Sequence, residues 1–200
     1  MKQSTTAVPV RERARRAMRE ELVTLAQSLF AEHGYESVTV EEIAQAAGMS
    51  RRTFFRYFAS KEELMLGKYD LLADQLVEQL TARPGDEPLW TSFRRCFDTV
   101  AEYFDDPERT AQAAGNVRLI HAHPALHAGL YERLARLQER WVDIVRERTG
   151  DHDRNDPRTP ALVGAAVACL AAAKTTWARG DQSRSLAQLI DDAMEAVTPA

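Results

Sequence analysis

The sequence predicts an all-α protein of about nine helices. Apolar residues recur at steps of three and four along almost every segment, which is the spacing of one helix face, and no segment sustains the alternation of a β-strand. Capping residues and glycines stand at the ends of these segments. With 200 residues, 44% of them hydrophobic and 28% charged, the chain can bury a sizeable core and differs from a disordered protein.

Three of the helices are predicted within the first 60 residues. The first carries an apolar stripe over 18–30 and ends at Gly34. A capping box over 39–42 opens the second helix, which Gly48 ends. The third helix covers 50–58, so a tight glycine turn separates it from the second.

A longer helix is predicted over 61–82, followed by the turn-forming run Arg83-Pro-Gly-Asp86. This run is the clearest break in composition and is typical of a linker. Beyond it, an apolar stripe over 93–104 ends at Asp105, and a helix is predicted over about 108–121. The next helix carries an apolar stripe over 130–145 and ends at Gly150. After a polar loop over 151–159, two helices over 161–179 and 183–197 close the chain.

The net charge of −4 hides an uneven distribution of charge. Residues 1–60 hold nine Lys/Arg against seven Asp/Glu, whereas residues 61–200 hold 17 against 23. The arginines of the first part form two clusters, over 11–19 and over 51–56. Attraction to phosphate acts over about one Debye length, roughly 8 Å at physiological salt, so local clusters matter more than the sum. The acidic total therefore does not exclude a nucleic-acid partner.

Cysteine usage and hydropathy indicate a cytoplasmic protein without a membrane partner. Cys96 and Cys169 form neither a disulfide framework nor a zinc-ligand spacing. The first ten residues lack the apolar core of a signal peptide, and the near-apolar run over 160–173 is too short to span a bilayer.

Residues 39–58 show the pattern of a helix-turn-helix. Ala44 and Ala47 are small enough for two helices to approach steeply, and Gly48 tolerates the left-handed backbone of a tight turn. The second helix then projects Arg51, Arg52, Thr53 and Arg56 outward from its first turns, where a recognition helix contacts base edges. The plainer alternative is a solvated arginine face.

Residues 15–65 resemble the DNA-binding domain of the TetR (tetracycline-repressor) family of bacterial regulators. The matching pieces are Ala26…Phe30…Gly34-Tyr35, Thr39-Val40…Ile43-Ala44…Ala47-Gly48-Met49-Ser50, and Thr53-Phe-Phe-Arg-Tyr-Phe58 followed by Ser60-Lys61-Glu62…Leu64. Beyond residue 80 the resemblance rests on the order and length of the helices.

The resemblance implies a set of DNA contacts in this domain. The residues concerned are Thr39, Ser50, Arg51, Arg52, Thr53, Phe55, Arg56, Tyr57 and Lys61. Arg51 and Arg52 fall on the base-reading turn, and most of the others fall where the family contacts phosphates. Phe55 departs from the family's common tyrosine and has no hydroxyl for a phosphate hydrogen bond. Phe54 and Phe58 are expected in the core, and the arginines over 11–19 are expected to touch the DNA backbone or minor groove.

The aromatic stripes after residue 88 have two interpretations, a packed core or the effector cavity that the resemblance implies. The candidate cavity residues are Phe93, Phe97, Val100, Phe104, Leu119, Trp141 and Trp177. Such a lining predicts a small hydrophobic effector. The sequence of residues 51–58 also resembles that of TetR-family members associated with fatty-acyl ligands.

No metal or other cofactor is expected. His121, His123 and His127 form the one cluster that looks like a metal site, but no Asp, Glu or Cys stands close enough in the sequence to complete a ligand set. A turn-capping or pocket-polar role is therefore favoured for these histidines.

Small residues are dense over 162–173, which favours close helix packing. This segment is either the central core helix of a monomer or, together with the last helix, the family's four-helix dimer interface. We favour a homodimer through the helices over 161–179 and 183–197.

The resulting hypothesis is a dimeric, ligand-responsive transcriptional regulator, a repressor released from a near-palindromic operator by its effector. Its domains are expected as a flexible basic arm over 1–14, the DNA-binding domain over 15–60, a connecting helix over 61–82, and a ligand-binding and dimerisation domain over 83–200. A small helical enzyme is the first alternative, although no nucleophile–base or carboxylate pair stands out in the sequence. A helical protein-interaction module is the second.

Overall fold

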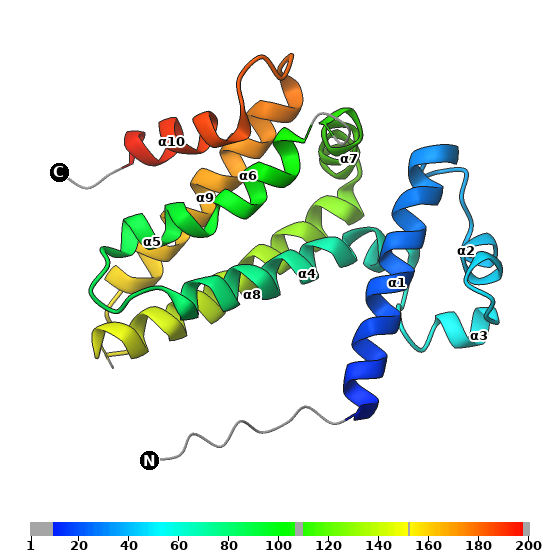
Figure 1. The fold of residues 1–200 in the computed structure, drawn as a ribbon, viewed down its shortest axis with the longest axis horizontal. Helices are drawn as coiled ribbons and strands as arrows, with labels where there is room; N and C mark the ends of the chain where they lie inside the picture. The colour runs from blue at the N-terminus through cyan, green and yellow to red at the C-terminus, as the bar shows by residue number, and fades with distance from the viewer. Residues whose placement is uncertain (1–9, 107–109, 152, 198–200) are drawn as a thin grey trace. The chain divides into compact units, whose positions relative to one another are not determined.

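The structure, a computed structural model, describes residues 10–106, 110–151 and 153–197, and all its regular elements in these ranges are α-helices (Figure 1). These are α1 (Val10–His33), α2 (Val40–Ala46), α3 (Arg51–Phe54), α4 (Lys61–Ala82), α5 (Leu89–Cys96), α6 (Asp98–Asp105), α7 (Thr110–Ala122), α8 (Pro124–Thr149), α9 (Arg158–Arg179) and α10 (Leu186–Ala196). Only Phe97 separates α5 from α6, and its backbone is itself right-handed helical, so the two form the single stripe that the sequence predicts. The all-α prediction is confirmed.

The chain divides into two compact units, residues 1–71 and residues 72–200, with the division inside α4. The run over 83–86, predicted as a linker, is instead a turn between α4 and α5 within the second unit. It is held there because Arg148, on α8, donates to the carbonyl oxygens of Gly85 (3.2 Å) and Glu87.

The first unit is built on one apolar core. Its buried residues include Leu22, Ala26 and Phe30 of α1, Ile43 and Ala44 of α2, Phe54 of α3, Phe58 in the turn that follows α3, and Leu64–Leu66 of α4. Burial of an apolar side chain stabilises a fold by about 1.5–3 kcal/mol, so this cluster supplies most of the unit's cohesion. The expected core positions of Phe54 and Phe58 are confirmed, with exposures of 0% and 1%.

The first helix begins earlier than the sequence predicts. Residues 10–14, predicted as part of a flexible basic arm, are the first turn and more of α1. No glycine or proline interrupts the chain between Val10 and His33, and arginine and glutamate are good helix formers. Residues 1–9 of the predicted arm lie outside the described residues.

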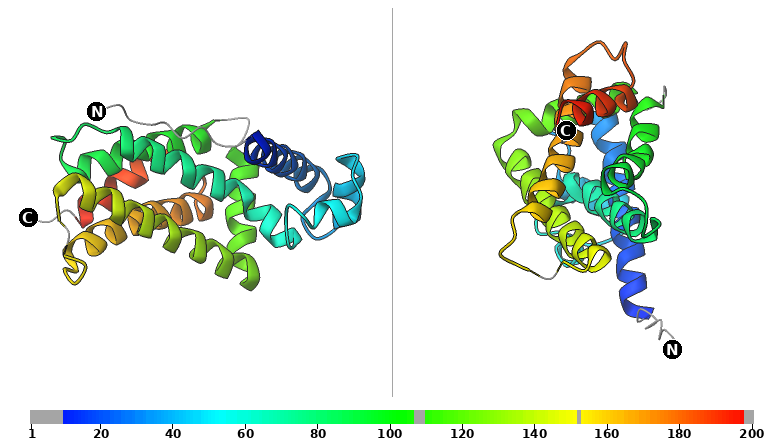
Figure 2. Two further views of the ribbon diagram at one scale, coloured as in Figure 1. Left: turned by 90° about the horizontal axis from the view of Figure 1, so that it is seen from below. Right: turned by 90° about the vertical axis from the view of Figure 1, so that its left-hand side faces the viewer.

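In the second unit, α9 packs against α7, α8 and α10 (Figure 2). Trp141 stacks on Phe93 and Phe97, with ring centroids 5.1 and 5.7 Å apart, and Phe104 meets Trp177 edge to face at 5.2 Å. Six of the seven predicted cavity residues are buried in this core, and Leu119 is half-buried.

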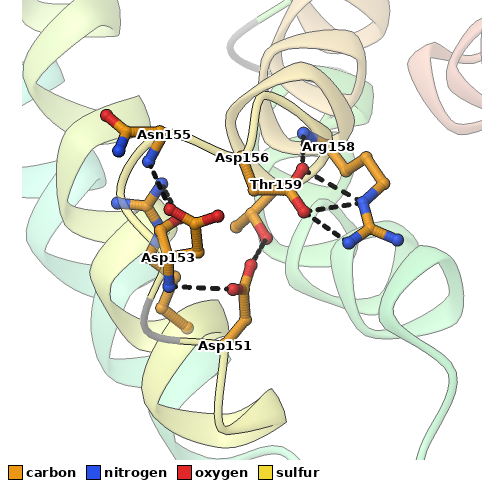
Figure 3. Close-up of polar contacts among 7 residues, drawn as sticks. Asp151, Asp153, Asn155, Asp156, Arg158 and Thr159 are labelled. Atoms are coloured by element: carbon orange, nitrogen blue, oxygen red, sulfur yellow. Dashed lines mark hydrogen bonds and ion pairs between the residues drawn. The ribbon is translucent and has the colours of Figure 1, made fainter.

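The ends of the last two helices are set by local hydrogen bonds. α9 begins at Arg158, three residues earlier than predicted, after a loop whose aspartates accept from nearby backbone amides (Figure 3). There Asp156 accepts hydrogen bonds from the side chain and then the amide of Arg158, which lower the pKa of Asp156 to about 2. α10 begins at Leu186 because Ser185 forms a capping box with Gln188.

Of the described helices, α9 is long and apolar enough to cross a membrane, judged by length and composition. Of its most apolar window, 44% is buried inside the chain. The core helix of a soluble protein meets the same criterion, so this feature is weak evidence for a membrane.

Gly67 lets α4 approach α1 closely, and its replacement tests the packing of the first unit. A Cβ atom at this position would lie 2.5 Å from Cγ2 of the buried, β-branched Val23. We expect Gly67→Ala to lower the free energy of unfolding by about 1–3 kcal/mol, as overpacking does, in urea unfolding followed by circular dichroism. Gly115→Ala is the control, because nothing lies within 4 Å of its added Cβ. It should stabilise the helix by about 0.5–1 kcal/mol, and equal effects of the two substitutions would contradict the close approach.

Candidate nucleic-acid interface

A left-handed turn at Gly48 joins α2 to α3. Gly48 has a φ of 63°, its amide donates to the Gln45 carbonyl (3.0 Å), and the Met49 amide donates to the Ala44 carbonyl (2.9 Å). This pair of hydrogen bonds is the Schellman motif, which satisfies the last carbonyls of a helix and redirects the chain. The direction of the next helix is therefore set by backbone geometry that glycine adopts without strain.

Ser50 caps α3, as the sequence predicts. Its hydroxyl accepts from the Thr53 amide (3.1 Å) and lies 2.9 Å from the Thr53 hydroxyl. The helix proper covers four residues and continues as a tight turn, in which the Tyr57 amide donates to the Phe54 carbonyl (2.8 Å). The predicted helix over 50–58 is thus regular only in its first half.

The outward face of α3 and its following turn carries three guanidinium groups. Arg51, Arg52 and Arg56 are exposed, and Phe55 between them is 42% exposed. Phe54, on the opposite face, is fully buried and anchors the helix to the core. Among the described residues no hydrogen-bond or ion-pair partner is seen for the guanidinium of Arg52 or Arg56. Both are available to an external anion.

Arg51 has a partner that the sequence analysis missed. Its Nη1 lies 2.9 Å from Oε1 of Glu41 on α2, and its guanidinium lies 5.5 Å from the centre of the Phe55 ring. The ion pair is open to solvent, with side-chain exposures of 65% and 56%. The two residues stand ten positions apart, on either side of the glycine turn, so no helical spacing in the sequence indicates the pair.

Arg19 is used inside the domain. It donates to the Tyr57 carbonyl, lies 3.2 Å from Oε1 of Glu63, and covers the Phe58 ring at 4.1 Å. Of the arginines over 11–19, which are expected to contact DNA, Arg19 therefore has its guanidinium engaged inside the domain. Its role is to hold the turn after α3 against α1 and α4.

Lys61 also has internal partners. Its Nζ donates to the carbonyl oxygens of Tyr35 (2.9 Å) and Val38 (3.1 Å) and lies 4.3 Å from the centre of the Tyr35 ring. The Tyr35 hydroxyl donates to Glu62 (3.3 Å), and burial together with this carboxylate raises the pKa of Tyr35. Lys61 thereby ties the loop before α2 to the start of α4, with one ammonium hydrogen left over.

Thr39 caps α2 in the predicted capping box. Its hydroxyl accepts from the Glu42 amide (3.2 Å), and its amide donates to Glu42 Oε2 (2.8 Å). The hydrogen bond from the Thr39 amide, followed by that from the Thr39 hydroxyl, lowers the pKa of the Glu42 carboxyl. Like Ser50, Thr39 is exposed while it caps, whereas Thr53, Tyr57 and Lys61 are half-buried. The structure thus brings all nine predicted contact residues into one unit.

Two families match this chain, one at each end. Residues 22–67 match the family described as bacterial regulatory proteins, tetR family, and residues 87–200 match the MftR C-terminal domain. The chain is 30% identical to the HTH-type transcriptional regulator TcmR of Streptomyces glaucescens over 206 residues, which cover 98% of this chain and 91% of that protein.

The chain belongs to the TetR family of bacterial transcriptional regulators. It is also 32% identical to MftR of Mycobacterium tuberculosis, over 86% of this chain and 85% of the relative. FadR of Thermus thermophilus, solved in complex with lauroyl-CoA, has a TM-score of 0.62 and 23% identity, with 91% of this chain and 97% of that chain covered. At this identity the likeness shows the fold.

The chain is therefore a DNA-binding transcriptional regulator that acts through its helix-turn-helix, and TetR-family regulators are not enzymes. The alternative of a small helical enzyme is wrong. Among the residues that the structure describes, no group of three His, Cys, Asp or Glu side chains is arranged to hold a metal ion.

The internal hydrogen bonds of Lys61 predict a structural effect of its removal. Lys61→Met leaves the carbonyl oxygens of Tyr35 and Val38 without their donor, which should cost about 1–3 kcal/mol of stability. Hydrogen exchange measured by mass spectrometry should therefore speed up over residues 35–43. Arg56→Met is the matched control, because it removes an exposed cation and should leave exchange there unchanged. Equal exchange in the two variants would show that the Lys61 ammonium does not hold this loop.

Proposed function

We propose that the chain is a homodimeric repressor that leaves a near-palindromic operator when a small hydrophobic effector binds its second unit. The observation that carries the DNA-binding part is the outward face of α3, where Arg51, Arg52 and Arg56 are exposed beyond a rigid glycine turn. The part that concerns assembly and effector rests on the second unit. We expect the protein to act in the cytoplasm, where its DNA is.

In this proposal Arg51 and Arg52 read bases in the major groove. An arginine fork matches O6 and N7 of guanine, which discriminates by about 1–3 kcal/mol per good pair. The Glu41 carboxylate accepts at Nη1 of Arg51, so that Nε and Nη2 remain for a base. A partner of this kind restricts the rotamers of a reading side chain before DNA arrives, which makes Glu41 a positioning residue.

The remaining contact residues position the domain on the DNA backbone. Arg56 is exposed and reaches phosphate freely, while Thr39 and Ser50 offer hydroxyls at the starts of α2 and α3. Thr53, Tyr57 and Lys61 are half-buried and make narrower contacts, and Phe55 offers only its ring. Such contacts set register without reading sequence.

The dimer is proposed through α9 and α10. Ala168 and Ala172 are exposed on α9, one turn apart, although that helix is apolar around most of its circumference. The Cys169 thiol donates to the Ala193 carbonyl (3.3 Å), so the two helices lie together and can present one surface. A two-fold axis through this surface pairs two recognition helices, which meet successive major grooves about 34–36 Å apart.

The effector is proposed to bind among the helices that hold Phe93, Phe97, Val100, Phe104, Leu119, Trp141 and Trp177. This lining is apolar and aromatic, which favours a hydrophobic molecule. FadR of Bacillus subtilis, solved in complex with stearoyl-CoA, shares the fold with a TM-score of 0.56, which makes a fatty-acyl effector one candidate. An effector that prefers the form unable to bind DNA lowers operator affinity, and operator lowers effector affinity by the same factor.

The experiment for the whole proposal is selection of bound fragments from genomic DNA, followed by footprinting. The proposal expects one or a few near-palindromic sites bound at low concentration, each protected over two half-sites about one helical turn apart. Binding to all fragments alike, or protection of a single half-site, would contradict it.

Substitutions at Arg51 and Glu41 test whether Arg51 reads bases and Glu41 orients it. On a selected operator, we expect Arg51→Ala to lower the affinity ratio of operator to unrelated DNA about 10- to 100-fold. Arg51→Lys keeps the charge but lacks the guanidinium fork, so the affinity ratio of operator to unrelated DNA should fall nearly as far as in Arg51→Ala. Glu41→Gln should lower the ratio by a smaller factor while binding to unrelated DNA holds or rises. Titration by fluorescence anisotropy at fixed salt measures all three, and an unchanged ratio for Glu41→Gln would refute its positioning role.

A charge on the proposed dimer face should separate the subunits. Ala172→Glu places an unpaired carboxylate at the centre of the packed surface, so sedimentation at micromolar concentration should show a monomer. Ala135→Glu, at an exposed alanine of α8, is the matched control and should remain dimeric. A dimer in both variants, with unchanged affinity, would place the interface elsewhere.

A further inference from the structure

Helices α7, α8 and α9 pack on one another, and four of their polar side chains meet at the corner between α7 and α8. Nε2 of His121, on α7, lies 3.1 Å from the Thr175 hydroxyl on α9. The His121 ring centre lies 5.1 Å from that of His127, on α8, which in turn lies 4.7 Å from the ring centre of Tyr131. We call these four residues the corner cluster. Neither the proposed DNA contacts nor the proposed effector lining includes any of them.

Two guanidinium groups border the corner cluster. Arg118 stands one helical turn before His121 on α7, and its Nη1 donates to the Ala178 carbonyl on α9 (2.7 Å). Arg179 follows Thr175 by four residues, so the two lie on one face of α9. Arg179 is exposed, and within the part of the chain that the structure describes no hydrogen-bond or ion-pair partner is seen for it. Its guanidinium is therefore available to an external anion.

The segments that build this corner contain no acidic residue. Neither 110–131 nor 157–180 holds an Asp or a Glu, although 30 of the 200 residues are acidic. Burial lowers the pKa of His121, and the positive charges of His127, Arg179 and Lys174 lower it further. The charges that act on His121 are thus all positive, in a chain whose total charge is −4. Such a local excess of positive charge attracts anions.

The hydrogen bonds of Thr175 determine which nitrogen of His121 carries a proton. The Thr175 hydroxyl has one hydrogen, which it donates to the Ala171 carbonyl (2.9 Å), so its oxygen accepts from His121 Nε2–H. The neutral imidazole therefore has its lone pair on Nδ1, and a second proton adds there. An anion bound nearby favours this second proton, because it offsets the surrounding positive charges.

The corner cluster also offers aromatic surface to solvent. Tyr131 is 55% exposed, and His121 and His127 are half-buried beside it. Aromatic rings pack favourably on one another edge to face or with an offset, and a guanidinium fork pairs with both oxygens of a carboxylate. Together these groups suit a flat ring that carries a carboxylate.

We propose that this corner binds a small aromatic carboxylate. The carboxylate pairs with the Arg179 guanidinium, the aromatic body packs on the rings of Tyr131 and His127, and His121 takes up a proton from solvent at Nδ1. The inference goes beyond the proposed function and does not rest on it, because the site shares no residue with the proposed DNA contacts or the proposed effector lining.

The test compares 1-naphthoate with 1-naphthamide, which has nearly the same shape and no charge, and with acetate, which has the charge and no ring. In equilibrium dialysis on the full-length protein, 1-naphthoate should bind about tenfold more tightly than either, which is the effect of one charge-assisted hydrogen bond. A pH titration of the His121 Cε1–H signal by NMR should show that 1-naphthoate raises the pKa of His121 and that 1-naphthamide does not.

Variants assign the effect to individual side chains. Arg179→Gln should abolish the preference for 1-naphthoate over 1-naphthamide, and Tyr131→Ala should weaken the binding of both by a similar factor. His121→Gln keeps a donor near the position of Nε2 but cannot take a second proton, so 1-naphthoate should no longer bind more tightly as the pH falls from 7 to 6. Arg95→Gln is the matched control, because it removes one exposed cation from α5 in the same unit. It should keep both the preference and the pH dependence.

Three results would overturn the inference. The first is that 1-naphthoate binds no more tightly than 1-naphthamide, and the second is a preference that survives Arg179→Gln. The third is displacement of 1-naphthoate by an equal concentration of inorganic phosphate, which would show a site for anions in general. The absence of any selected operator would instead refute the proposed function, and the measurements with 1-naphthoate do not depend on it.

Discussion

The DNA-binding unit depends on the left-handed turn that ends α2. The Met49 amide reaches back to the Ala44 carbonyl only because Gly48 adopts a φ of 63°, and this hydrogen bond sets where α3 begins and where it points. Ser50 can cap α3 because the turn ends one residue earlier. Because Phe54 is buried in the core, the opposite face of the helix is exposed to solvent, and Arg51, Arg52 and Arg56 lie on it. A non-glycine residue at this φ would be sterically strained. Relief of that strain would change the turn and therefore the direction of α3.

Positive charge in the first unit has two separate uses. Arg19 and Lys61 donate to backbone carbonyls and cover aromatic rings, so their charges hold the turn after α3 and the loop before α2. The three arginines of the outward face make no such contacts within the domain, apart from the solvent-exposed ion pair of Arg51 with Glu41. This division explains how a chain with a net charge of −4 can bind DNA, because the cations that matter are local and aimed outward.

Local patterns in the sequence predicted much of the fold, including the caps and the glycine turn that position the candidate site. The capping box at Thr39, the glycine at 48 and the serine cap at 50 each act within a few residues, and their geometry follows from those residues alone. The Glu41–Arg51 ion pair joins residues 10 positions apart, and the hydrogen bonds from Arg19 and Lys61 to backbone carbonyls join residues 38 and 26 positions apart. Helical periodicity carries no information at these separations. The turn over 83–86 has the composition of a linker, but only the contact from Arg148 shows that it belongs to a folded unit.

The central claim is that one set of cations faces DNA while another holds the domain together. It is tested most directly by side-chain NMR of the arginine Nε–H groups during titration with a duplex that contains the selected operator. The account predicts that the signals of Arg51, Arg52 and Arg56 shift and become protected from exchange, while the Arg19 signal stays in place. A shift of Arg19 with unchanged signals from the three outward arginines would contradict it.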